Sequence, residues 1–142
     1  MSKAGRMEVT DERNILFVYI LKLIKELNPK YVLIENVPEF IKFNYINPET
    51  NSEEKIIERI YNDLDKNYNI NTKVLDAKYY QVPQSRKRAI LLISRKDQKE
   101  WKIPENILND NNLITVEQTI GHLPSLESNE KYKGKDNYLK KW

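Results

Sequence analysis

The feature that most constrains the fold is a short apolar run, Tyr31–Ile34, enclosed by chain breakers. Asn28-Pro29 precedes it and ends any earlier helix, because proline disfavours helical geometry in the residue before it. Residues 35–38, which end in proline, follow it. An apolar run bounded in this way is typical of a buried strand of the parallel type. A second apolar run at residues 88–94 predicts another buried strand, and residues 71–76 alternate like a half-exposed one.

Two longer helices are expected beside these strands. Residues 15–27 are dense in apolar side chains, which predicts a largely buried helix that Thr10 or Asp11 can cap. Ser52 can cap a second helix that runs to about Lys66. The inward stripe of the second helix would consist of Ile56, Ile57, Ile60, Tyr61 and Leu64.

The remaining segments are less regular. Residues 44–52 contain asparagines and a proline and are expected to form a loop, and residues 96–112 are polar and irregular. Residues 115–120 predict a short capped helix. The lysine- and asparagine-rich end of the chain predicts a flexible polar tail at residues 126–142, after one domain at residues 1–125.

The order helix, strand, helix, strand, strand predicts an open α/β fold. Three strands make a thin sheet, and the apolar fraction of 39% is below the usual ~45–50% of globular domains. The chain is therefore expected to be part of a larger sheet. A strand as apolar as residues 31–37 should not lie bare at an edge, because its unpaired backbone groups would invite another chain to pair with it.

Composition excludes several kinds of site within the chain. There is no cysteine, which rules out a disulfide framework, a cysteine-ligated zinc site and a cysteine nucleophile. The chain has a single histidine, so a metal cluster is not expected either. The net charge of +3 is too small to identify a nucleic-acid binder. No apolar stretch approaches the length of a membrane span or a signal peptide, so we expect a cytoplasmic protein.

Glu35 is the most informative polar residue, because it stands at the carboxyl end of a predicted strand, where open α/β sheets place their ligand crevices. One interpretation is a solvated loop carboxylate or a helix cap. The other is a carboxyl group in a partly dry pocket, where desolvation raises its pKa so that it can share a proton with a ligand nitrogen.

Arg86 and Arg88 are two residues apart at the entrance of the last strand, so in an extended chain they project to the same side. Their guanidinium groups suit phosphate oxygens and base carbonyls, although a solvated basic turn would look the same. His122 is interpreted as a structural or exposed loop residue. The lysines at residues 131–141 are interpreted as a solvated tail that could touch a phosphate backbone.

Together these signals form a known pattern. Glu35-Asn36-Val37 directly follows one apolar strand, and Gln84-Ser85-Arg86-Lys87-Arg88, preceded by Pro83, leads into another. They resemble the Glu-Asn-Val and Gln-x-Arg-x-Arg motifs of the cytosine-5 DNA methyltransferase family. Residues 2–6 and 11–17 resemble the segments after its Pro-Cys-Gln motif, and residues 115–124 the segment before its target-recognition region.

The resemblance implies a partial Rossmann-like methyltransferase sheet of about three strands, the last antiparallel, with flanking helices. In this family a cysteine thiolate attacks C6 of a cytosine flipped out of the duplex, and C5 takes a methyl group from S-adenosylmethionine. Glu35 matches the glutamate that holds the ring N3 and the exocyclic amine. Arg88 matches the arginine that contacts the base carbonyl O2, and Arg86 the one that helps to hold the base and the adjoining backbone.

Weaker matches extend the implied site. Gln84 would support the closed loop, Ser2 and Arg13 would reach phosphates near the flipped nucleotide, and Leu16 would border the adenine of the cofactor.

Several parts of the family pattern are missing from the chain. It has no Pro-Cys-Gln cysteine, no glycine-rich cofactor loop and no target-recognition domain. The resemblance therefore implies that S-adenosylmethionine is bound mainly by an N-terminal part that is missing here, and that this chain is inactive alone.

Three hypotheses follow for the function. The first is a truncated or split part of a DNA methyltransferase from a restriction–modification system, with double-stranded DNA as substrate and a complementary fragment as partner. The second is a fragment of a tRNA-methylating relative. The third is a non-catalytic assembly module that forms a homodimer through the exposed strand.

Overall fold

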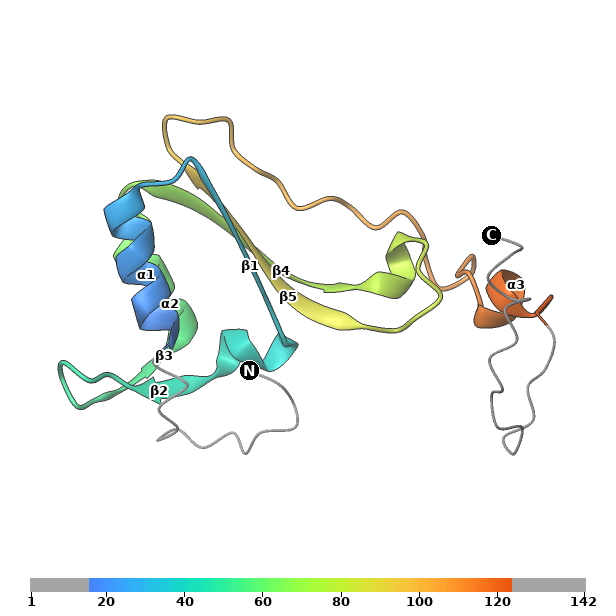
Figure 1. Cartoon of the computed structure of the whole chain (residues 1–142), viewed down its shortest axis with the longest axis horizontal. Coiled ribbons are helices and arrows are strands. Elements are labelled where there is room, and N and C mark those ends of the chain that lie inside the picture. The colour runs from blue at the N-terminus through green and yellow to red at the C-terminus, as the bar shows by residue number, and fades with distance from the viewer. Residues whose placement is uncertain (1–15, 124–142) are drawn as a thin grey trace, which may run out of the picture.

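A three-stranded sheet and two helices that pack on one of its faces form the main body of the structure, a computed structural model that describes residues 16–123 (Figure 1). In chain order the elements are α1 (Leu16–Leu27), β1 (Tyr31–Asn36), η2 (Pro38–Lys42), β2 (Asn44–Ile46), β3 (Glu53–Lys55), α2 (Ile56–Leu64), β4 (Tyr68–Asp76), η3 (Ala77–Tyr80), β5 (Lys87–Arg95) and α3 (Val116–Ile120). None of the helices described is both long and apolar enough to cross a membrane.

The sheet has the order β1-β5-β4, and β5 runs antiparallel to both neighbours. The predicted α/β fold with a three-stranded partial sheet and an antiparallel last strand is confirmed. The prediction of a parallel, buried first strand is wrong for the described residues, because β1 pairs only with β5 and its residues alternate between exposed and half-buried. The cause is the position of β1 at the edge of this sheet, where one strand neighbour is present instead of two.

The core lies on the face of the sheet that α1 and α2 cover. Ala89, Leu91 and Ile93 alternate along β5 and are fully buried, because successive side chains of a strand point to opposite faces. Packed with or beside them are Phe17, Val18, Leu21, Ile24, Phe40, Phe43, Tyr45, Ile56, Ile60, Leu64 and Tyr68.

Only one face of α1 is buried, so the prediction of a largely buried helix is wrong. Phe17, Val18, Leu21 and Ile24 face the core. The opposite face is also apolar but exposed, with Leu16 60%, Tyr19 63%, Ile20 46%, Leu23 51% and Leu27 68% accessible. We call these five residues the outer stripe of α1. The sequence contains enough apolar residues to bury the helix on two sides, but the described chain supplies a partner for one.

The segment before α2 differs from its prediction. Residues 44–46 and 53–55 pair as a small antiparallel hairpin, β2–β3, where a loop and a helix start were expected. The helix therefore begins at Ile56, and its cap residue is Lys55 rather than Ser52. The predicted stripe is largely correct, because Ile56, Ile60 and Leu64 are buried, whereas Tyr61 is 38% exposed.

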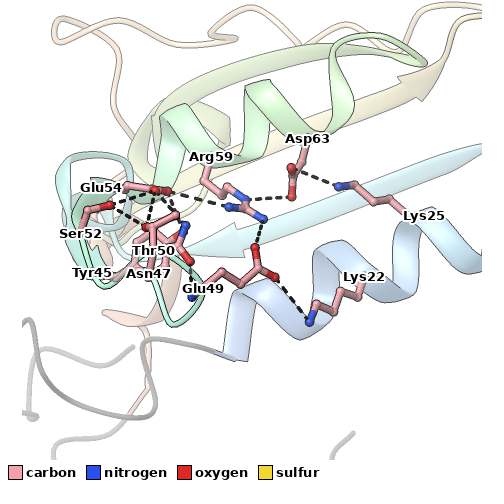
Figure 2. A network of polar contacts seen from close by, with 10 residues as sticks. All are labelled: Lys22, Lys25, Tyr45, Asn47, Glu49, Thr50, Ser52, Glu54, Arg59 and Asp63. Carbon is pink, nitrogen blue, oxygen red and sulfur yellow. Dashed lines mark hydrogen bonds and ion pairs between the residues drawn. The ribbon is translucent and has the colours of Figure 1, made fainter.

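A network of ion pairs around Arg59 of α2 ties this hairpin to both helices (Figure 2). Its Nε donates to Asp63 Oδ2 at 3.0 Å, and a terminal nitrogen lies 3.6 Å from Glu49 Oε2 in the hairpin turn. From α1, Lys25 Nζ lies 3.1 Å from Asp63, and Lys22 Nζ lies 3.9 Å from Glu49. These contacts hold the chain segment that follows Glu35 against the helices.

Glu54 of β3 is the acceptor in the same network (Figure 2). Asn47 donates to its Oε1 at 2.8 Å and the Tyr45 hydroxyl to its Oε2 at 3.1 Å. The hydrogen bond from Asn47, with others, lowers the pKa of Glu54 below its usual value. Burial and the bond to Glu54 raise the pKa of Tyr45 to about 12. At neutral pH Glu54 is therefore an ionised carboxylate and Tyr45 keeps its hydroxyl proton.

The remaining predictions agree well with the structure. The half-exposed strand is β4, extended back to Tyr68, and the last strand is β5. Residues 96–115 contain no helix or strand, and Thr115 caps α3 in a capping box with Gln118. The predicted tail at residues 126–142 lies outside the described residues.

Candidate functional site

Glu35 and Arg88 meet on one face of the sheet, opposite the α1 and α2 face. Glu35 of β1 is in register with Ile90 of β5, so Arg88, two residues before Ile90, is its diagonal neighbour on the same face. Arg88 Nε lies 2.7 Å from Glu35 Oε1, which is the distance of a charge-assisted hydrogen bond. The strand register therefore brings together two of the three residues predicted to act on the base.

This pair is more exposed than expected. The side chain of Glu35 is 49% accessible and that of Arg88 is 26% accessible. Of the two interpretations of Glu35, the described residues therefore favour a solvated carboxylate, because they leave about half of its side chain accessible and form no dry pocket around it. Both side chains are accessible to a ligand, and each is the other's ion-pair partner.

Arg86 lies in the loop before β5 and not in the strand itself. Its backbone N–H donates to Asp76 Oδ1 at 2.9 Å, and its carbonyl accepts from the N–H of Ala77 at 3.1 Å. Its side chain is exposed and makes no polar contact within residues 16–123. The structure thus pairs Arg88 with Glu35 but leaves the Arg86 side chain in solvent.

Gln84 lies in the same loop and is also exposed. Its backbone N–H donates to the Val82 carbonyl at 2.7 Å. This tight turn places Gln84 immediately before the two arginines.

Asp76 organises this loop, and sequence reasoning missed it. The residue is only 6% exposed. Its carboxylate accepts from the N–H groups of Lys78 and Arg86 and from the Ser85 hydroxyl, the last at 3.1 Å. Burial raises the pKa of Asp76, but these hydrogen bonds outweigh the burial and hold it below its usual value. An aspartate that ends a strand and can cap the next helical turn was the available signal.

A pocket of about 330 Å³ lies beside the same loop, at the end of β4 and β5. It is lined by Lys73, Val74, Asp76, Lys78, Tyr79, Ser85, Lys87 and Asn106. Neither Glu35 nor Arg88 lines it. The pocket lies toward β4, and the Glu35–Arg88 pair lies toward β1, so the two are separate features.

The other predicted residues are only partly placed. Leu16 begins α1 and is 60% exposed, at one end of the outer stripe. His122 is exposed just after α3. Ser2 and Arg13 lie outside the described residues.

Comparison with known proteins identifies the family. The sequence model of the C-5 cytosine-specific DNA methylase family matches residues 1–142. The Type II methyltransferase M1.HgaI of Avibacterium volantium is 39% identical over 134 residues, which are 90% of this chain and 35% of that protein. The Type II methyltransferase M1.HphI of Haemophilus parahaemolyticus is 35% identical over 90% of this chain and 32% of its own length.

A solved structure shares the fold. A DNA modification methyltransferase encoded within an E. coli prophage superposes with a TM-score of 0.60 and 24% identity, over 82% of this chain and 32% of that one. The chain thus spans about a third of the length of the proteins that it matches. Because the family model matches the whole chain and these Type II methyltransferases align over most of it, the chain belongs to the C-5 cytosine-specific DNA methylase family.

Proposed function

We propose that this chain supplies the base-binding part of a DNA (cytosine-5)-methyltransferase of a restriction–modification system, with activity in the complete enzyme only. The observation that carries the proposal is the 2.7 Å contact between Glu35 and Arg88 at the ends of adjacent strands. The relatives named Type II methyltransferases support the restriction–modification context.

The two side chains offer the polarity that a cytosine needs. A carboxyl group accepts from the exocyclic amine of cytosine and can share a proton with N3, and a guanidinium group donates to the carbonyl O2. In the absence of a base Glu35 and Arg88 bind each other, so an entering pyrimidine would exchange one ion pair for contacts to both groups. A proton held at N3 draws electron density from the ring and favours attack at C6.

The loop residues complete this base site. The hydrogen bonds of Asp76 fix the backbone of Arg86, and we infer that its solvent-exposed side chain and Gln84 close on the base and the adjoining backbone once DNA is bound. Ser2 and Arg13 would contact phosphates in the same complex.

The cofactor would be held mostly by residues outside this chain. S-adenosylmethionine, when bound, supplies the methyl group. Leu16 is apolar and exposed and fits the edge of an adenine ring. With three glycines in the whole chain, none of them beside another, no glycine-rich loop is present to cradle the rest of the molecule. We therefore infer that an N-terminal part of the enzyme binds S-adenosylmethionine and provides the nucleophile.

The partner in this proposal is the complementary part of the methyltransferase domain. The outer stripe of α1 and the unpaired edge of β1 are apolar surfaces that a larger domain would cover, and relatives about three times as long contain the sequence to cover them. A homodimer through β1 is the alternative occupant. Double-stranded DNA would be the substrate of the assembled enzyme.

The test is complementation. The chain is co-expressed with a methyltransferase fragment that carries Pro-Cys-Gln, and incorporation of labelled methyl groups into cytosine of DNA is measured. Glu35→Gln and Arg88→Gln should each lower the rate about 100-fold. Glu58→Gln is the matched control, because Glu58 is an exposed carboxylate of α2 whose one ion-pair partner within residues 16–123 is Lys55 of β3.

Two failures are distinguishable in this assay. If no combination with an upstream fragment methylates cytosine, the split-enzyme proposal is wrong. If methylation occurs but Glu35→Gln and Arg88→Gln behave like Glu58→Gln, the base-binding assignment is wrong.

A further inference from the structure

The pocket beside the loop gathers cationic side chains that base recognition does not use. Lys73 comes from β4, Lys78 from η3 and Lys87 from the start of β5, and all three line the same 330 Å³ space. A pocket of this size is at the lower end of those that hold small ligands. Three lysines among the eight lining residues favour an anion over a cation as its occupant.

Two of these three ammonium groups are available. Lys78 Nζ is engaged, because it donates to Asp110 Oδ1 at 2.9 Å. Lys73 Nζ lies 3.7 Å from Glu105, whose side chain is 93% exposed, and such a solvent-exposed pair contributes little. Lys87 has no ion-pair partner within residues 16–123.

The other polar groups of the pocket wall do not favour a cation. The Asp76 carboxylate is already bound by three donors from the loop. The Asn106 side chain accepts from the Tyr80 hydroxyl through Oδ1 at 3.2 Å, which leaves its amide N–H groups as donors. The donors of the lining that a phosphate group can use are therefore the ammonium groups of Lys73 and Lys87 and the amide of Asn106.

We propose that this pocket binds a phosphate group, and that its physiological occupant is a phosphodiester of the nucleic-acid strand that enters the base site. The inference rests on the proposed function, because it places DNA at the Glu35–Arg88 pair. Glu35 of β1 and Lys73 of β4 are both in register with Ile90 of β5, so they lie on the same face of the sheet, about 10 Å apart at roughly 4.8 Å per strand. That separation is about three nucleotide rises along one strand. A phosphate close to the base can therefore reach Lys73, at the side of the pocket that faces the base site.

The test uses the full chain and two probes. Inorganic phosphate is titrated while the amide resonances of Lys73, Lys87 and Asn106 are followed by NMR. Binding of a duplex oligonucleotide is measured by fluorescence anisotropy at several salt concentrations. The variant is the double substitution Lys73→Gln/Lys87→Gln. Lys66→Gln is the control, since Lys66 is an exposed lysine just before the opposite end of β4.

Phosphate should shift these amides in the wild type and in Lys66→Gln but not in the double variant. The double variant should also bind DNA about 10-fold more weakly, with a slope of log affinity against log salt that is smaller by about 1. Amide shifts with an unchanged slope would support the pocket as a site for free phosphate and overturn its assignment to DNA. Absence of shifts, or an equal effect of Lys66→Gln, would overturn the pocket itself. Neither readout needs methyl transfer, so failure of the methylation assay is a separate result.

Discussion

Gln81 is the residue whose backbone conformation is least suited to its side chain. It ends η3 in the left-handed region, with φ 64° and ψ 21°, where a side chain is disfavoured and glycine is not. The turn that delivers Gln84 and the two arginines passes through this residue, so its conformation bears on the base site.

Gln81→Gly should therefore stabilise the fold by about 0.5–1 kcal/mol, since the native backbone suits glycine. Urea denaturation would measure the change. Gln84→Gly serves as the comparison, because Gln84 is in the same loop without a positive φ, and it should not stabilise the protein. A loss of stability in Gln81→Gly would show that the Gln81 side chain matters more than its backbone.

Glu54 should make stability depend on acidity. Its pKa is lowered in the folded chain, first by the hydrogen bond from Asn47, so its contribution is complete above the unfolded value of about 4.3. That contribution is lost as the pH falls through the folded pKa. Chemical denaturation between pH 7 and pH 3 should therefore show a steeper loss of stability at acid pH in the wild type than in Glu54→Gln. Equal pH profiles for the two proteins would contradict the role of this carboxylate.

Helix α1 offers a matched pair at the scale of one element. Leu21 is 2% exposed and Leu23 is 51% exposed, two positions apart on the same helix. Leu21→Ala should destabilise the chain by about 2–4 kcal/mol, because it leaves a cavity in the core. Leu23→Ala should change the free energy of unfolding by less than about 0.5 kcal/mol. A large loss for Leu23→Ala in thermal or urea unfolding would mean that the outer stripe is covered in the chain alone.

At the scale of the whole molecule, the edge of β1 should drive association of the chain in the absence of a larger domain. Leu33 is 55% exposed on this edge strand, and a lysine on an edge strand disfavours pairing with another chain. Leu33→Lys should lower the dimer fraction in sedimentation velocity. Ile120→Lys adds the same charge at a 50% exposed position of α3 and should have little effect. A wild-type chain that stays monomeric at high concentration would refute pairing through β1.

The accuracy of the sequence predictions followed the range of the interactions involved. β5 and the capped turn of α3 were predicted correctly, because apolar content and the Thr115 capping box are local signals. The β2–β3 hairpin was missed, because Glu53-Glu54-Lys55 carries no strand pattern and pairs only through its contact with residues 44–46. The burial predictions for α1 and β1 were wrong for the same reason. A high content of apolar residues shows that a segment is suited to burial, but it does not show whether another segment packs against it.

The sequence by itself determined the family, the positions of the main strands and the identity of Glu35 and Arg88 as candidates, because motif residues and apolar runs are properties of neighbouring positions. Only the tertiary structure decided that Arg88, and not Arg86, meets Glu35, since that depends on the register of β5 against β1. It also decided that Asp76 holds the loop and that the lysines of β4, η3 and β5 share a pocket. Such contacts join residues that are distant along the chain, and only the packing of the strands brings them together.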